Sequence, residues 1–263
     1  MVDKRDRNSK DLIKNFGSNT RKTSDQTEID MFIARGRNSS TQDIQAFVDQ
    51  TQRIGRTRAG GKSGRLMFAM DATASREPSW DQACHLQSEM FHEAMSIGSL
   101  EVQLTYYRGY GEFRATSWVD NSEALLGSML RVSCLGGKTQ IEKVLNQAVN
   151  ETQKNRIQAV VFIGDAFEED IDTVSEVAGK LGVLGVPMFC FQEGNDPLAR
   201  IGFQQLAKLT NGAYCSFNSK SAGQLKELLK AVAVFAVGGF DELEKYSRKN
   251  RGEALKLSHQ IKK

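Results

Sequence analysis

The central part of the chain alternates between short, almost fully apolar runs and longer segments with a helical apolar period. Runs such as 65–71 and 157–164 are apolar nearly throughout and lead to an acid. Strands buried on both faces have this character. The segments between the runs repeat apolar residues at three- and four-residue spacing, which predicts amphipathic helices. We therefore predict strands at 65–71, 100–109, 112–118, 157–164, 186–192 and 213–217, and helices at 79–96, 122–130, 139–152, 170–181, 196–209 and 221–237.

This order of elements predicts the α/β fold class. Apolar strands separated by helices indicate a doubly wound, mostly parallel sheet with helices on both faces. The run at 112–118 follows the run at 100–109 across a short glycine-containing turn, so we expect one antiparallel edge strand there. We expect Ser79 to cap the first helix and Asn211-Gly212 to end the helix over 196–209.

The two ends of the chain differ from its centre in charge. Residues 1–65 hold 14 Lys and Arg against 8 Asp and Glu, residues 66–240 hold 14 against 20, and residues 241–263 hold 7 against 4. The first forty residues have too little apolar content to offset the entropy of ordering them. We predict a basic, largely flexible extension over 1–64 with one helix at 40–54, a single domain over 65–238, and a polar, basic, helical tail over 239–263.

Composition removes several classes of protein. The chain has 263 residues, of which 40% are hydrophobic and 25% charged, as in ordinary globular proteins. Its four cysteines form no CxxC pair, so neither a zinc ribbon nor a disulfide scaffold is expected. The longest apolar tract, 228–240, contains Lys230 and is too short to span a bilayer, and no signal peptide is predicted. We expect a cytoplasmic protein without a membrane partner.

Polar side chains gather where the predicted strands end and helices begin. The segments concerned are DATAS at 71–75, GGKT at 136–139 and Asp165 after the run at 157–164. In open parallel sheets, ligands bind beyond the carboxyl ends of the strands. Hydroxyl and carboxylate oxygens suit Mg²⁺ or Mn²⁺ rather than zinc. The alternative is a metal-free cluster whose carboxylates cap helix N-termini.

These motifs resemble the metal-ion-dependent adhesion site of the von Willebrand factor A (VWA) domain family. In that family a D-x-S-x-S loop is followed by a distant threonine and then by a distant aspartate. The resemblance covers about residues 65–237. Thr73 replaces the first serine but keeps a hydroxyl, and Ala166 stands where the family often has glycine. The loops DATAS, GGKTQI and VVFIGDAFEE supply Asp71, Thr73, Ser75, Thr139 and Asp165.

The resemblance implies a role for each of these residues. Thr73 and Ser75 would bind Mg²⁺ or Mn²⁺ directly, and Thr139 directly or through water. Asp71 and Asp165 would hold coordinated waters, and a carboxylate from a protein partner would complete the octahedron. The function implied is metal-dependent protein binding and not catalysis. The chain also resembles bacterial cytoplasmic stand-alone members of the family, which often act as adaptors beside AAA+ ATPases.

Two other functions remain open. A haloacid-dehalogenase-like phosphotransferase would use Asp71 as its nucleophile, although Thr73 stands where most members carry a second aspartate. An RNA-associated role would use the basic residues of 1–65. Because no aromatic residues interleave with those basic residues, a solvated tail is the preferred interpretation there.

Two further clusters have competing interpretations. His85, Glu89 and His92 lie on one helix face, but a metal site there would need a second set of ligands, so we expect a polar surface. The aromatic segment 105–113 is either a contact patch or ordinary packing.

Overall fold

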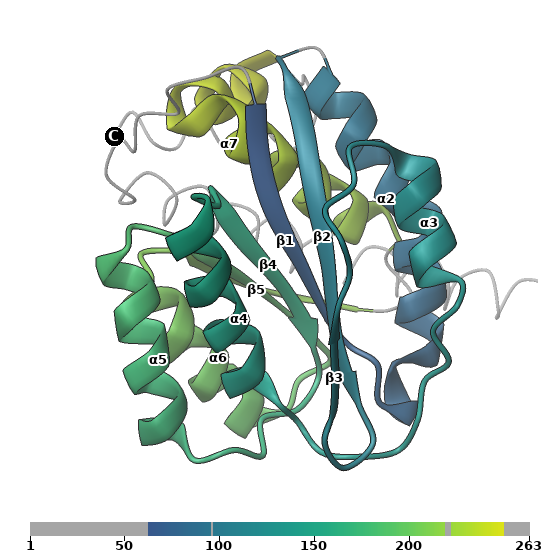
Figure 1. Cartoon of the computed structure of the whole chain (residues 1–263), viewed down its shortest axis with the longest axis vertical. Coiled ribbons are helices and arrows are strands. Elements are labelled where there is room, and N and C mark those ends of the chain that lie inside the picture. The colour runs from purple at the N-terminus through teal and green to yellow at the C-terminus, as the bar shows by residue number, and fades with distance from the viewer. Residues whose placement is uncertain (1–62, 96, 219–221, 250–263) are drawn as a thin grey trace, which may run out of the picture. The chain divides into compact units, whose positions relative to one another are not determined.

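The computed structural model describes residues 63–95, 97–218 and 222–249 and confirms the predicted fold class. One six-stranded sheet has the order β3-β2-β1-β4-β5-β6, and only the β2–β3 pair is antiparallel (Figure 1). The strands are β1 (Ser63–Asp71), β2 (Ser99–Arg108), β3 (Glu112–Ala115), β4 (Ala159–Gly164), β5 (Met188–Glu193) and β6 (Ala213–Phe217).

Helices cover both faces of this sheet. α2, α3 and α7 pack on one face and α4, α5 and α6 on the other, as Figure 1 shows. A short 3₁₀ turn, η1 (Ala74–Arg76), connects the β1 loop to α2. The helices are α2 (Glu77–Met95), α3 (Ser122–Met129), α4 (Ile141–Lys154), α5 (Ile171–Val183), α6 (Pro197–Leu209) and α7 (Ala222–Lys249).

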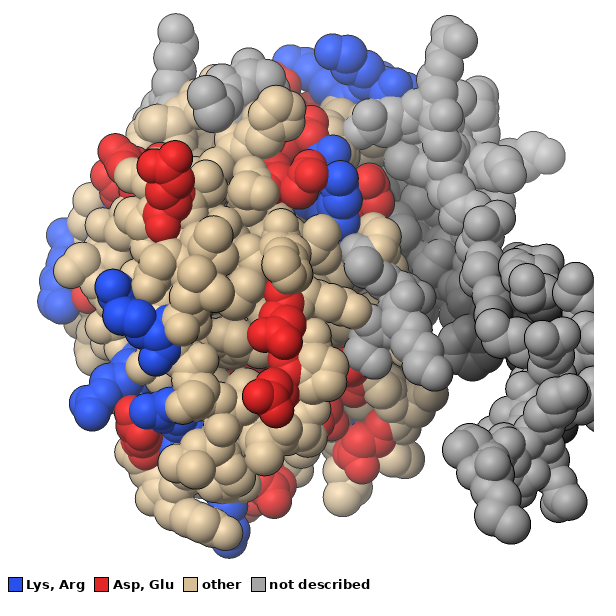
Figure 2. Space-filling model, turned by 90° about the vertical axis from the view of Figure 1, so that its right-hand side faces the viewer, with Lys and Arg blue, Asp and Glu red and all other residues tan. Residues whose placement is uncertain are grey.

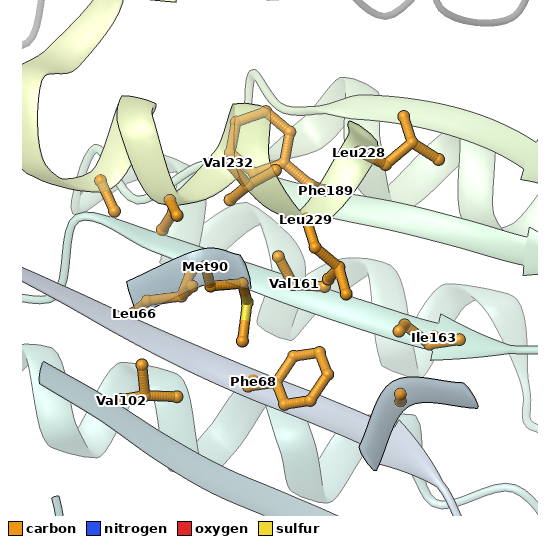
Figure 3. Packing of buried hydrophobic residues seen from close by; sticks show 14 of the residues in the cluster. Leu66, Phe68, Met90, Val102, Val161, Ile163, Phe189, Leu228, Leu229 and Val232 are labelled. Carbon is orange, nitrogen blue, oxygen red and sulfur yellow. The ribbon is translucent and has the colours of Figure 1, made fainter. Parts of the chain in front are cut away.

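Alternation along the strands divides the core between the two faces. In β1, Leu66 and Phe68 point toward α2 and α7, whereas Met67 and Ala69 belong to the cluster under α4, α5 and α6. Figure 3 shows the first cluster, in which Phe68 lies near the side chains of neighbouring strands and helices. Burial of both faces explains why the parallel strands have continuous apolar sequences. The labelled members are Leu66, Phe68, Met90, Val102, Val161, Ile163, Phe189, Leu228, Leu229 and Val232.

Three of the described helices, α3, α5 and α6, begin at a local side-chain cap. Asn121, Asp170 and Asp196 cap α3, α5 and α6 by accepting the backbone N–H of the third helical residue. The predicted cap Ser79 is wrong, because α2 begins at Glu77 and the Ser79 hydroxyl donates to the Arg76 carbonyl instead. The chain enters α2 directly from η1, so Ser79 already lies within the helix.

The strand predicted at 112–118 is shorter than expected. β3 ends at Ala115, but the chain continues beside β2, where Val119 forms an isolated antiparallel bridge with Val102. The Thr116 N–H donates to the Leu104 carbonyl, so this edge remains partly paired. The antiparallel edge strand itself is confirmed.

The last helix continues beyond the predicted end of the domain at residue 238. Gly239 adopts φ 69°, a conformation that favours glycine, and the chain turns there and resumes a helix to Lys249. Leu243, beyond the turn, is buried in the core. The glycine pair at 238–239 therefore produces a kink, and residues up to Lys249 belong to the fold.

The extension predicted over 1–64, except its last two residues, lies outside the described residues, as do the helix predicted at 40–54 and the tail beyond 249. None of the helices that the structure describes is long and apolar enough to cross a membrane.

Gly64 sets the distance between β1 and α7 and provides a stability test. A Cβ at this position would lie 2.5 Å from the Ala236 carbonyl oxygen. We expect Gly64→Ala to lower the free energy of unfolding by about 2 kcal/mol because the packed helix must shift. Gly179, in α5, has no atom within 4 Å of an added Cβ, so Gly179→Ala should instead raise it by roughly 0.5 kcal/mol. Urea unfolding measures both variants, and equal effects would contradict the close approach.

Candidate functional site

Parallel pairing of β1 with β4 brings two strand-end acids to the same edge of the sheet. Met70 pairs with Ile163, so Asp71 and Asp165 lie at or just beyond the end of the paired region on neighbouring strands. The β2 turn at 109–111 reaches the same edge, because Asp71 is in register with Tyr107 on β2. This edge is the lower one in Figure 1, where the β2–β3 turn lies.

Asp71 is buried and receives two hydrogen bonds. Its Oδ1 accepts the Thr73 backbone N–H at 2.7 Å, and its Oδ2 accepts the Tyr107 hydroxyl at 3.1 Å. The side chain of Tyr107 is fully buried and stacks against Phe162. Burial raises the pKa of the Tyr107 hydroxyl well above its ordinary value, as do the nearby carboxylates, so the phenol remains a donor. Tyr107 therefore orients the carboxylate on which the loop is built.

Burial also raises the pKa of the Asp71 carboxyl above its ordinary value of 3.8. Hydrogen bonds from Thr73 oppose this shift, and the charge on Asp165 adds to it. A buried carboxylate of this kind is stabilised by a nearby cation. The electrostatics of the edge therefore favour a positive group beside Asp71 and Asp165.

Ser75 joins the loop after β1 to the loop after β4. Its hydroxyl donates to Asp165 Oδ2 at 2.7 Å, across 90 residues of sequence, and its Oγ lies 3.5 Å from the Thr73 Oγ1. Three of the predicted site residues, Thr73, Ser75 and Asp165, are therefore linked by neighbouring oxygens, and Asp71 holds the same loop through the Thr73 N–H.

Thr139 lies in the loop before α4 and is hydrogen-bonded to the loop that follows β4. Its N–H donates to Glu168 Oε2 at 3.1 Å, and its Oγ1 accepts the Glu168 N–H at 3.0 Å. Glu168 is three residues beyond Asp165, so the loop bearing Thr139 is fixed to the loop bearing Asp165. No direct hydrogen bond joins Thr139 to Ser75 or Asp165 among the contacts of the described residues.

Glu169 caps α4 from a distance of 28 residues in sequence. Its two carboxylate oxygens accept the N–H groups of Ile141 and Glu142 at 2.6 and 2.9 Å. Gln140, the residue before the helix, makes no side-chain cap. Two of the acids near Asp165 thus serve as the structural caps considered from the sequence, whereas Asp71 and Asp165 do not.

Two charged residues that the sequence analysis missed complete the site. Arg76, whose side chain is only 1% exposed, is hydrogen-bonded to Glu193 at the end of β5, and its Nη1 lies 4.0 Å from Asp165 Oδ2. Glu193 obeys the same rule as Asp71 and Asp165, an acid at the end of a buried strand, so this pattern could have identified it. No motif identified Arg76.

The donor set of this edge fits a hard divalent cation. Thr73 and Ser75 present adjacent hydroxyl oxygens, and Asp71 and Asp165 provide carboxylates behind them. Hydroxyls, carboxylates and waters suit Mg²⁺ and Mn²⁺. No group of three or more His, Cys, Asp or Glu side chains in the described part of the chain is arranged to hold a metal. A site here therefore depends on the hydroxyls as ligands.

The structure also describes the His85–Glu89–His92 face of α2 and the aromatic segment 105–113. Glu89 forms an ion pair with Lys226 at 2.8 Å, which lowers the pKa of Glu89 and joins α2 to α7. His85 and His92 are exposed. In the aromatic segment, Tyr106 packs edge-to-face on Trp80, Tyr107 supports Asp71, and Tyr110 is exposed. Tyr106 and Tyr107 therefore contribute to packing, whereas Tyr110 is available at the surface.

Comparison of the fold with solved structures finds VWA domains. A von Willebrand factor type A protein from Catenulispora acidiphila superposes with a TM-score of 0.56 at 13% identity, over 68% of this chain and 43% of that one. An aerotolerance-related membrane protein from Bacteroides fragilis NCTC 9343 gives 0.51 at 15% identity, over 69% and 99%. Proximal thread matrix protein 1 from the mussel byssus, with a zinc-occupied metal-ion-dependent adhesion site, gives 0.52 at 13%, over 66% and 46%.

These likenesses define a VWA-like α/β fold, as the resemblance implied. This chain spans less than half the length of the first and third of these proteins. No protein-family model matches the sequence, and no curated protein matches it either.

Gly137 determines how closely the Thr139 loop approaches the β2–β3 turn. A Cβ there would lie 2.0 Å from the Gly109 carbonyl oxygen, which accepts the Lys138 N–H. We expect Gly137→Ala to lower the free energy of unfolding by about 2 kcal/mol. An added Cβ at the adjacent Gly136 meets nothing within 4 Å, so Gly136→Ala should change it by less than roughly 0.5 kcal/mol. If urea unfolding showed a larger loss of stability for Gly136→Ala than for Gly137→Ala, the close approach at Gly137 would be contradicted.

Asp71 should reduce stability as pH rises in protein kept free of divalent ions with EDTA. Because its folded pKa is raised above 3.8, its contribution to stability is fully present below that value and is lost as the pH rises through the folded pKa. Asp71→Asn carries no ionising carboxyl, and its Oδ1 can still accept the Thr73 N–H. We expect the variant to gain stability relative to wild type as the pH rises above about 4. A difference that is constant or falls with pH in urea unfolding would contradict the shift.

Proposed function

We propose that this protein is a metal-dependent protein-binding module and not an enzyme. The observation that carries the proposal is the link between Ser75 and Asp165, which joins two loops into one set of hydroxyl and carboxylate oxygens. Thr73 and Ser75 would bind Mg²⁺ or Mn²⁺ directly, Thr139 directly or through water, and Asp71 and Asp165 through coordinated waters. The ion supplies a Lewis-acidic position that a partner's carboxylate can occupy.

Exposed apolar side chains beside the site support a protein partner. Tyr110 is 86% exposed in the turn after β2. Leu135 is 53% exposed, and its backbone N–H donates to the Ala72 carbonyl beside the site. Leu198 and Ile201, in the first turns of α6, are also exposed at the edge where β5 ends. Exposed aromatic and apolar groups are typical of contact surfaces. A segment carrying one carboxylate flanked by apolar side chains would suit this edge.

The contacts of Asp71 count against the phosphotransfer alternative. A nucleophilic carboxylate needs an oxygen that substrate can reach. Asp71 is 1% exposed, and both of its oxygens accept hydrogen bonds within the protein. A covalent phosphate on Asp71, detected by mass spectrometry after incubation with acetyl phosphate, would restore that alternative.

The face of the domain that Figure 2 shows gives little support to nucleic-acid binding there. On the face that Figure 2 shows, acidic and basic side chains of the described residues are interspersed among uncharged ones, without a continuous basic patch. Binding to nucleic acid generally requires clustered Lys and Arg. The basic residues of 1–62 lie outside the described residues, so an RNA-associated role through that arm remains a separate hypothesis. The proposal, in contrast, includes an adaptor role beside an AAA+ ATPase in the cytoplasm, which identification of the captured partner would test.

Ser75 provides the direct test of the proposal. We expect Ser75→Ala to weaken Mn²⁺ binding at least about tenfold in calorimetry, because a direct ligand is lost. Ser63, at the opposite end of β1, is exposed and serves as the matched control, so Ser63→Ala should bind as wild type does. Proteins that the immobilised wild-type chain retains in Mg²⁺ should be released by EDTA. The Ser75→Ala chain should not retain them, whereas the Ser63→Ala chain should. Equal retention under all these conditions would remove the metal from the function.

A further inference from the structure

Arg76 is a buried cation placed within the acidic edge of the sheet. It follows Ser75 directly in the sequence, and arginine is almost never fully buried unless it is paired. Its partner is Glu193, and its Nη1 also lies 4.0 Å from Asp165 Oδ2, the oxygen that accepts the Ser75 hydroxyl. The Nε and Nη2 groups of Arg76 have no hydrogen-bond partner among the described residues. Packing alone does not account for a guanidinium that is only partly satisfied at this position.

The charges of this edge leave room for one divalent ion. Asp71, Asp165 and Glu193 provide three carboxylates, and Arg76 provides one positive charge. With these four groups ionised, two negative charges remain, and Glu168 and Glu169 on the loop after β4 add to the negative potential of the edge, so a divalent ion is attracted there. Arg76 and such an ion are both attracted to Asp165, and they repel one another. Glu193 holds the guanidinium on the β5 side and thereby limits this competition.

We infer that the Arg76–Glu193 pair sets the affinity of the site for its cation. The inference rests on the proposed function, since it concerns the same site. Arg76 lowers the negative potential at Asp165 and weakens the binding of a divalent ion. Glu193 strengthens binding, both through its own charge and because it draws Arg76 away from Asp165. The two members of one ion pair therefore act on cation affinity in opposite directions.

Calorimetric titration of the full chain with Mn²⁺, and separately with Mg²⁺, tests this inference. Arg76→Met should tighten binding about tenfold, and Glu193→Gln should weaken it about tenfold, because each changes the site by one charge in a low-dielectric setting. The double variant R76M/E193Q restores the net charge and leaves neither member of the Arg76–Glu193 pair buried without its partner. It should bind within about threefold of wild type. The rise in melting temperature on adding Mn²⁺ should follow the same order.

The outcomes separate this inference from the proposed function. Weaker cation binding in both single variants would mean that the pair only supports the loop, and would overturn the inference. Unchanged cation binding in Arg76→Met would also overturn it, while leaving the metal site intact. If Arg76→Met does not fold, equal affinities of Glu193→Gln and the double variant overturn it. Binding by Arg76→Met but not by wild type would support control by Arg76 and contradict metal dependence in the native chain. Absence of binding in every variant would overturn both.

Discussion

The pairing of β1 with β4 is the constraint on which the rest of the site depends. Both strands are buried on both faces and end at the same edge, so their terminal acids cannot separate without breaking the centre of the sheet. The charge on Asp165 raises the pKa of the buried Asp71 carboxyl and so disfavours its ionisation. The surrounding groups act on that repulsion: Tyr107 and the Thr73 N–H hold Asp71, and Ser75 and Arg76 approach Asp165.

Carboxylates at the ends of buried, apolar strands are usually paired with hydrogen-bond donors or cations. Here the pairing is unequal. Asp71 receives only neutral donors, whereas Asp165 has a hydroxyl donor and a guanidinium at 4.0 Å. The charge that remains after internal pairing therefore lies toward Asp71 and the two hydroxyls. An added cation would stabilise the ionised form of Asp71 and so oppose the cost of its burial.

The sequence predicted the fold and located the residues that meet at the candidate site, for physical reasons that differ between the two. Continuous apolar strands and periodic helices identify a doubly wound sheet because burial on both faces determines which residues are acceptable. Strand-end acids and hydroxyls could be located because parallel strands share one edge. Tyr107 was visible only as an aromatic residue, since its hydrogen bond to Asp71 depends on the β1–β2 register. Arg76 has no periodic or motif signature, and the kink at Gly239 could not be distinguished from a helix end.

The two hydrogen bonds from α4 to Glu169 link this edge to the body of the domain. A loop that merely crossed the sheet edge could move alone, but this one carries the carboxylate that satisfies the first amides of a helix from another part of the chain. Displacing it would leave the Ile141 and Glu142 N–H groups without their acceptor and remove the negative charge that stabilises the N-terminus of that helix. Any force applied to the loop is therefore transmitted to α4, and the first turn of α4 would fray as the loop departs.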